Sequence, residues 1–154
     1  MAEHSFDLVV VGAGASGLLA AIAARRLGRN VLVVEATSLA GGSTAGSDGK
    51  LWLPANPLQA KLGVTDSSAE ALEYLDAVLG ATTDASTAER RAGYANLSGK
   101  IARWLVSSHI PLAVVKTLPD HHPELPGGKA KGRVLATQPL DRRTLGDNAQ
   151  LLAP

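Results

Sequence analysis

Short apolar runs separated by glycine-rich or polar segments dominate the first part of the chain. A β-branched run at residues 8–11 precedes a glycine-rich turn and then a segment rich in Ala and Leu, which predicts a strand, a tight turn and a helix. Residues 31–34 form a second apolar run of strand length, which ends at Glu35. The pattern therefore predicts a βαβ unit over residues 6–36.

Loops are expected on both sides of a possible third strand. Residues 41–57 are rich in Gly and Pro, which favours an extended loop over a regular element. Residues 112–116 form a short apolar run that indicates a strand, and residues 118–133 read as a polar Pro/Gly loop. No closing element is evident between there and the end of the sequence.

Two further helices are indicated by capping boxes. Ser67 with Glu70 predicts a helix over about 67–79, and Ser86 with Glu89 predicts a helix over about 86–108. The apolar face of the second helix is expected to consist of Ile101, Trp104 and Leu105.

Composition restricts the class of protein. The 154 residues are 45% hydrophobic and 19% charged, typical of a globular α/β chain, and one domain over 1–154 is the expectation. A formal net charge of +1 provides no field to attract nucleic acid. The sequence has no cysteine, which excludes disulfides, thiolate metal sites and a thiol-based redox centre. Redox chemistry would therefore need a cofactor.

The N-terminal sequence has no basic segment followed by an apolar stretch, so we expect no signal peptide. Arginines interrupt the longest apolar region before it reaches the ~20 residues that a transmembrane helix needs. A cytoplasmic protein without a transmembrane segment is the expectation.

Three glycines in the first turn have the spacing of a dinucleotide-binding fingerprint. Gly12 allows the tight turn, Gly14 lets the backbone approach a pyrophosphate, and Gly17 lets helix and strand pack closely. Phosphates would lie at the N-terminus of the helix, where free N–H groups and the helix dipole favour negative charge.

Two features that follow the second predicted strand indicate which dinucleotide binds. They are the acidic residue Glu35 and the glycine-rich segment after it. The Glu35 carboxylate is suited to bind the adenosine ribose hydroxyls and disfavours a 2′-phosphate. FAD and NAD both use such a unit, and the Gly41-Gly42-Ser43-Thr44 element favours FAD because it resembles the glycine doublet that follows this unit in many FAD enzymes.

Several segments outside the fingerprint are also distinctive. They are residues 41–45, 51–57, 62–67, 71–75, 118–128, 132–133 and 145–146. With these segments, the chain from Phe6 to about Gly146 resembles the FAD-binding part of 3-ketosteroid Δ1-dehydrogenases, members of the fumarate reductase and succinate dehydrogenase flavoprotein superfamily.

The resemblance implies an α/β Rossmann-like domain with a parallel sheet, and FAD as cofactor. It also implies α,β-dehydrogenation of a ketosteroid or similar cyclic ketone, in which a tyrosine-type base takes a proton and the flavin takes a hydride. Ser43, Thr44 and Ser47 would lie along the FAD, and the segment from Leu118 to His122 would border the substrate cavity. The residues expected to bind FAD are Gly12, Ala13, Gly14, Ala15, Ser16, Gly17, Glu35, Ala36, Gly41, Gly42, Ser43, Thr44 and Ser47.

Two segments depart from the family pattern. Where the family usually has Pro-Asp-Tyr-Tyr, this chain has His121 and His122, and His121 is the one catalytic candidate, as a base or proton relay. A solvent-exposed loop is the alternative interpretation of this pair. Adjacent histidines rarely ligate one ion, so no metal site is expected. Asp48 also departs from the usual Ser-Gly, and a carboxylate near a flavin would disfavour the anionic reduced form.

Family members are several times longer than this chain. We therefore expect a fragment, a degenerate remnant or one subunit of a split enzyme, and favour the last, with a second polypeptide supplying the substrate domain and the rest of the flavin pocket. The other hypotheses are a non-catalytic nucleotide-binding module and a subunit of a fumarate reductase-like enoate reductase.

Overall fold

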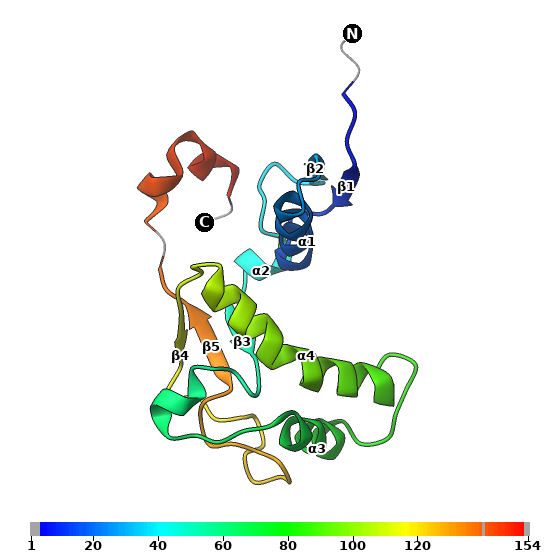
Figure 1. The fold of residues 1–154 in the computed structure, drawn as a ribbon, viewed down its shortest axis with the longest axis vertical. Coiled ribbons are helices and arrows are strands. Elements are labelled where there is room, and N and C mark those ends of the chain that lie inside the picture. The colour runs from blue at the N-terminus through cyan, green and yellow to red at the C-terminus, as the bar shows by residue number, and fades with distance from the viewer. Residues whose placement is uncertain (1–3, 140, 153–154) are drawn as a thin grey trace. The chain divides into compact units, whose positions relative to one another are not determined.

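The computed structural model describes residues 4–139 and 141–152. Residues 1–154 were expected to form one domain. In the structure, the chain forms two compact units. Unit 1 comprises Met1–Gly49 with Pro139–Pro154, and unit 2 comprises Lys50–Gln138. Figure 1 shows the helices and strands of both units.

Unit 1 is built on a βαβ motif. Strand β1 (Leu8–Val11) leads into helix α1 (Ala15–Arg26), and strand β2 (Val31–Val34) returns parallel to β1 with four residues of each strand in register. The Asp7 carboxylate accepts a 2.7 Å hydrogen bond from the Asn30 amide and thereby joins the starting points of the two strands.

Two short helical segments complete unit 1. Helix α2 (Gly42–Ala45) follows β2, and the 3₁₀ segment η2 (Arg142–Leu151) brings the last part of the chain back to it. The Ala40 amide donates to the Leu151 carbonyl over 2.7 Å. The prediction of an extended loop over 41–57 is wrong at the start of that segment, because the Ala45 amide donates to the Gly41 carbonyl and closes a helical turn there.

Unit 2 contains an antiparallel sheet of order β3-β5-β4. The strands are β3 (Lys50–Trp52), β4 (Leu112–Val114) and β5 (Val134–Thr137). The strand expected at 112–116 is present in shorter form. Strand β3 lies inside the predicted loop 41–57, and β5 had no predicted counterpart. Both depend on pairing between residues far apart in sequence, such as Lys50 with Ala136.

Helices α3 (Ser68–Leu79) and α4 (Ala88–Ser107) pack against each other beside this sheet, and η1 (Gln59–Leu62) precedes them (Figure 1). The predicted cap of α3 is present, since Ser67 Oγ accepts from the Glu70 amide over 3.1 Å. The predicted cap of α4 at Ser86 is wrong. Thr87 is the N-cap and accepts from the Arg90 amide, while Ser86 Oγ accepts from the buried side chain of Arg91.

Small residues make the buried face of α4. Ala95, Ser98, Gly99 and Ala102 are buried together with Leu105, which lets the helix approach its neighbours closely. The apolar face predicted from Ile101, Trp104 and Leu105 is thus wrong in part, because Ile101 is 42% exposed and Trp104 is half-buried. No described helix combines the length and the apolar character that crossing a membrane requires.

Candidate functional site

The turn between β1 and α1 requires glycine at two positions. Gly12 has a φ of +99°, a conformation that side chains disfavour, and its amide donates to the Val34 carbonyl over 2.7 Å. A Cβ on Gly17 would lie 2.0 Å from the Gly12 carbonyl oxygen, a distance no structure tolerates. The first turn of α1 therefore packs directly on the preceding loop.

The N-terminus of α1 is suited to bind an anion. Its N-cap is Gly14, which provides no side-chain hydrogen bond, and the first turn contains no acidic residue. Ala15 and Ser16 in that turn are exposed. Backbone amides and the positive end of the helix dipole there favour a phosphate.

The segment that follows β2 packs on the same turn. The Gly41 amide donates to the Ala13 carbonyl over 2.9 Å, and a Cβ on Gly42 would lie 3.5 Å from the Gly14 Cα. Thr44 Oγ1 accepts from the Ala15 amide at 3.4 Å. The structure thus brings together two predicted cofactor-binding segments that are separated in sequence, the glycine turn and the glycine doublet.

The exposed residues of the second segment continue this surface. Ser43 is exposed on α2, and Ser47 Oγ donates to the Thr44 carbonyl over 2.8 Å while accepting from the Gly49 amide. Ala36 is exposed two residues after the end of β2.

Glu35 has a structural role that sequence reasoning did not assign to it. Its Oε2 accepts from the Ala13 amide over 2.7 Å, and its Oε1 accepts from the amide and hydroxyl of Thr37. The Ala13 hydrogen bond, followed by those of Thr37, holds the pKa of Glu35 below its usual value. A carboxylate has about four acceptor positions, so Oε2 can still accept from a ribose hydroxyl.

His121 lies in unit 2, in the loop between β4 and β5. Two hydrogen bonds close the neck of this loop. The Asp120 amide donates to the Lys129 carbonyl, and the Lys129 amide donates to the Asp120 carboxylate. The side chain of His121 is exposed, whereas the His122 amide donates to the Tyr74 hydroxyl. No cluster of three or more His, Asp or Glu suited to a metal occurs in the described part of the chain.

A buried charge network supports this loop and was not anticipated from the sequence. Arg133 donates to Asp66 through Nε and Nη2 and to Asp120 through Nη1, over 2.7 to 2.9 Å. Trp52 Nε1 donates to the other oxygen of Asp120, and the guanidinium lies 5.4 Å from the Trp52 ring. All three charged side chains are inaccessible to solvent.

Burial and pairing act in opposite directions on this network. Burial raises the pKa of Asp66, but hydrogen bonds from Arg133, Gln59 and the Ala55 amide outweigh it, and the net shift is downward. The pKa of Arg133 is raised, since its two carboxylates outweigh the effect of burial. The sequence contains one indication of this network, since Asp120 and Arg133 both lie in segments of the family resemblance. Their pairing could not be predicted from their spacing.

A tight glycine turn, a helix N-terminus without an acidic residue and an acid that ends the second strand define a dinucleotide-binding unit of the Rossmann type. The chain belongs to the family described as FAD binding domain, whose model matches residues 7–153. FAD is the cofactor of this family.

Relatives extend the comparison to particular enzymes. The chain is 37% identical over 156 residues to a 3-oxosteroid 1-dehydrogenase of Mycolicibacterium smegmatis, covering 100% of this chain and 27% of the relative. It is 34% identical over 134 residues to a 4-oxocyclohexanecarboxylate 2-dehydrogenase of Sinomonas cyclohexanicum, covering 86% and 23%. The chain thus spans about a quarter of the length of these relatives.

A solved structure shows the same backbone. The crystal structure of 3-ketosteroid Δ1-dehydrogenase from Sterolibacterium denitrificans in complex with 1,4-androstadiene-3,17-dione superimposes with a TM-score of 0.82 and 33% identity, covering 96% of this chain and 26% of that one. The chain is therefore the FAD-binding part of a ketosteroid dehydrogenase-like flavoenzyme, and its homologues are FAD-dependent oxidoreductases.

Proposed function

We propose that the chain contributes the FAD site to an enzyme that introduces a double bond beside the ketone of a ketosteroid or similar cyclic ketone. The observation that carries this proposal is the 37% identity to a 3-oxosteroid 1-dehydrogenase over the whole chain, combined with an intact glycine turn. The second relative, named for a cyclohexanone acid, supports a cyclic ketone as the shared substrate feature.

Bound FAD would supply the acceptor for a hydride. In this proposal the α1 N-terminus binds the pyrophosphate, because its first turn contains no acidic residue and its Gly14 N-cap provides no side-chain hydrogen bond. Glu35 orders the Ala13 amide through Oε2 and accepts from a ribose hydroxyl with the remaining lone pair of the same oxygen. Ser43 and Ser47 of the second segment lie along the remainder of the cofactor.

His121 is proposed as a base or proton relay on the substrate side. Its side chain is exposed at the end of a loop whose neck is closed at Asp120 and Lys129. Imidazole side chains can act as proton acceptors and donors, and histidine is a common general base or proton relay in enzymes. His122 differs from it, since its Nδ1 lies 3.1 Å from the Glu124 carboxylate.

A second polypeptide is proposed to supply the substrate domain and the rest of the flavin pocket. The support is that the chain spans about a quarter of its relatives' length. Assembly with this polypeptide as a hetero-oligomer belongs to the same proposal. The cytoplasmic location stays a prediction.

The test uses the complex purified from the cells that make the chain. We expect oxidation of a 3-ketosteroid or of 4-oxocyclohexanecarboxylate with an artificial electron acceptor, measured as a new conjugated enone absorbance. Replacing His121 with Ala should lower the rate about 100-fold, in the range of general acid–base catalysis. His122→Ala is the matched control and should change it little. A flavin-containing complex that oxidises neither ketone would contradict the proposed reaction, and equal rates for both variants would remove His121 from it.

A further inference from the structure

Helix α4 carries a second apolar stripe on its exposed side. Tyr94, Leu97 and Ile101 are 46%, 50% and 42% exposed and follow one another at intervals of three and four residues, with half-buried Trp104 next in the series. This spacing puts them on one face of the helix. A helix that packs on one side only has a polar opposite face, so the stripe requires a second packing partner.

An open groove adjoins the N-terminal end of this stripe. It has a volume of about 250 Å³ and lies between α3 and α4, where it is lined by apolar parts of Trp52, Leu75, Leu79 and Tyr94, with Arg90 and Arg91 also at its wall. Tyr94 is fixed at the edge by its hydroxyl, which donates to the Trp52 carbonyl over 2.5 Å, and its ring stacks on Trp52 at 5.8 Å. The groove is therefore a preformed receptacle for one large apolar side chain.

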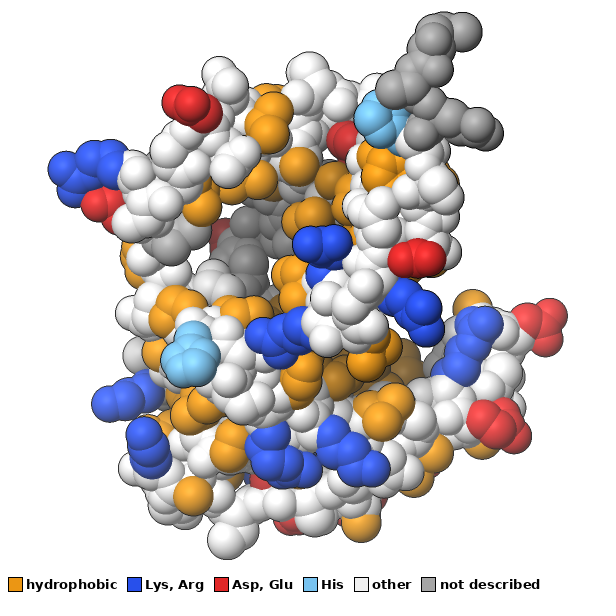
Figure 2. Space-filling view, turned by 45° about the horizontal axis from the view of Figure 1, so that its top comes forward, with side chains coloured by type: hydrophobic (Ala, Val, Ile, Leu, Met, Phe, Trp, Pro, Cys, Tyr) orange, Lys and Arg blue, Asp and Glu red, His pale blue; other side chains and the backbone are white. Residues whose placement is uncertain are grey.

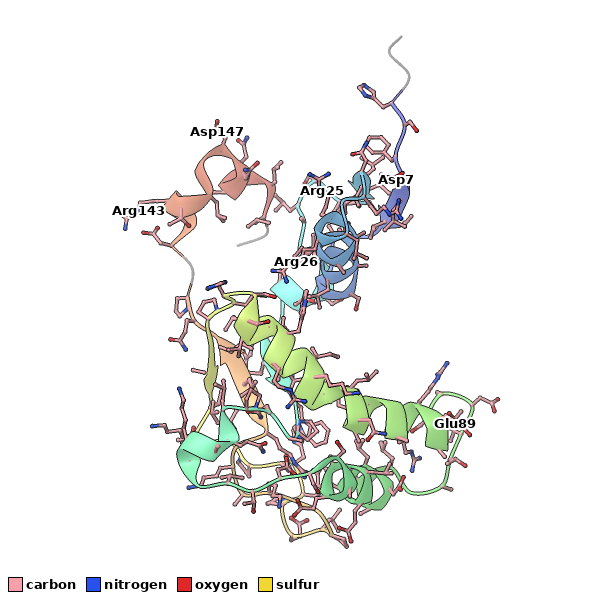
Figure 3. The ribbon with its side chains drawn as sticks, in the orientation of Figure 1. Asp7, Arg25, Arg26, Glu89, Arg143 and Asp147 are labelled. Carbon is pink, nitrogen blue, oxygen red and sulfur yellow. The ribbon has the colours of Figure 1, made fainter. Side chains whose placement is uncertain are left out.

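The charged residues of α4 that lie beside the stripe are positive. Arg90 lies in line with Tyr94 one turn earlier, and Lys100 is exposed beside Leu97. The one acidic residue of α4, Glu89, lies in its first turn at the end of the helix (Figure 3). On the face that Figure 2 presents, hydrophobic side chains are open to the surface, with lysines and arginines among them. Charge complementarity calls for an acidic partner surface.

We propose that the groove and the Tyr94–Leu97–Ile101 stripe are the docking face for an amphipathic helix of the polypeptide that supplies the rest of the flavoenzyme. That helix places a bulky apolar side chain in the groove, further apolar residues along the stripe, and a carboxylate beside Arg90. The proposal rests on the proposed function. About three quarters of the relatives' length has no counterpart in this chain, so the required occupant is available there. A second copy of the chain fits poorly, since it would bring like-charged arginines together.

The test places a photoreactive phenylalanine analogue at Leu97 of the full chain in the cells that make it. Asn96, exposed on another face of α4, receives the same probe as the control. After irradiation and purification, we expect an adduct from position 97 with a helical, acidic and apolar segment of a second polypeptide that has the sequence of a flavoenzyme substrate domain. The probe at position 96 should give at least tenfold less of this adduct.

Two substitutions provide an independent readout. Leu97→Asp should reduce the copurified second polypeptide about tenfold, whereas Asn96→Asp adds the same charge one residue away and should leave it unchanged. Circular dichroism of both variants checks that α4 remains folded. Any of four outcomes would overturn the proposed docking face. They are adducts with residues 1–49, adducts with a second copy of the chain, equal amounts of adduct from both positions, and no adduct.

Flavin absorbance of the same samples separates the two proposals. A flavin-containing complex without the Leu97 adduct contradicts the docking face alone. An adduct in a flavin-free complex supports the docking face and contradicts the proposed function.

Discussion

The Glu35 carboxylate accepts a 2.7 Å hydrogen bond from the amide of Ala13, which lies in the glycine turn 22 residues earlier. The acid that ends β2 therefore also fixes the backbone of the turn where the cofactor phosphates are proposed to bind. One side chain joins the ribose end of the proposed site to its phosphate end.

Removing the charge of Glu35 should weaken cofactor binding without unfolding the chain. Glu35→Gln retains an oxygen for the Ala13 amide but weakens that bond, because charge-assisted hydrogen bonds are stronger than neutral ones. We expect FAD affinity of the purified complex to fall about tenfold, measured by flavin fluorescence. Glu73→Gln removes an exposed carboxylate from α3 and is the control. Equal affinities for the two variants would show that Glu35 has no part in the site.

Two glycines of the turn should separate folding from cofactor binding. A Cβ on Gly17 would collide with the Gly12 carbonyl at 2.0 Å, whereas a Cβ on Gly14 would meet its nearest neighbour, the Gly41 carbonyl, at 4.0 Å. We expect Gly17→Ala to lower the melting temperature of the chain. Gly14→Ala should leave that temperature nearly unchanged yet reduce FAD binding, because the added methyl group occupies the path of the pyrophosphate. A Gly14→Ala variant with normal FAD affinity would contradict this position for the phosphates.

Local sequence was sufficient for the parts of unit 1 that depend on neighbours in the chain. The run at residues 8–11, the glycine turn and the run at 31–34 are each local features, and β1 and β2 occupy those positions. The contact of the glycine doublet with the turn was not readable, because it depends on Gly41 meeting Ala13 through a tertiary backbone hydrogen bond.

The buried network of unit 2 should be essential for stability. Arg133→Met leaves Asp66 and Asp120 buried without their cation, which should cost about 3–5 kcal/mol of the free energy of unfolding. Arg143 forms a solvent-exposed ion pair with Asp141, and Figure 3 shows the Arg143 side chain on η2 pointing outward. Arg143→Met is the matched control and should leave the melting temperature unchanged. Similar denaturation midpoints for both variants would argue against a structural role of Arg133.

Acid should weaken unit 2 through Asp66. Its pKa is lowered in the folded chain from an ordinary value of 3.8, so the folded state favours the carboxylate. The resulting stabilisation is fully present above pH 3.8 and is lost as the pH falls through the lower folded value. Urea titrations from pH 6 down to pH 2 should show this loss, and Asp66→Asn should abolish that part of the pH dependence. An unchanged pH profile in Asp66→Asn would assign the acid sensitivity to another group.

Unit 2 contains contacts that could not be predicted from the sequence. The Ser67–Glu70 cap is local and was readable, but β3 and β5 pair across the intervening helices and loops. Arg133 and Asp66 are 67 residues apart, and each alone looks like an ordinary surface charge. Ile101 follows a helical apolar pattern yet is exposed, because small residues rather than large ones form the buried face of α4.

The claim that this chain forms the FAD site of a larger flavoenzyme is tested most directly by native mass spectrometry of the complex purified from its source, with an absorption spectrum of the same sample. The account predicts a second polypeptide, one FAD per pair, and flavin bands near 370 and 450 nm, roughly as for a bound flavin. A complex or single chain that carries no flavin would contradict it.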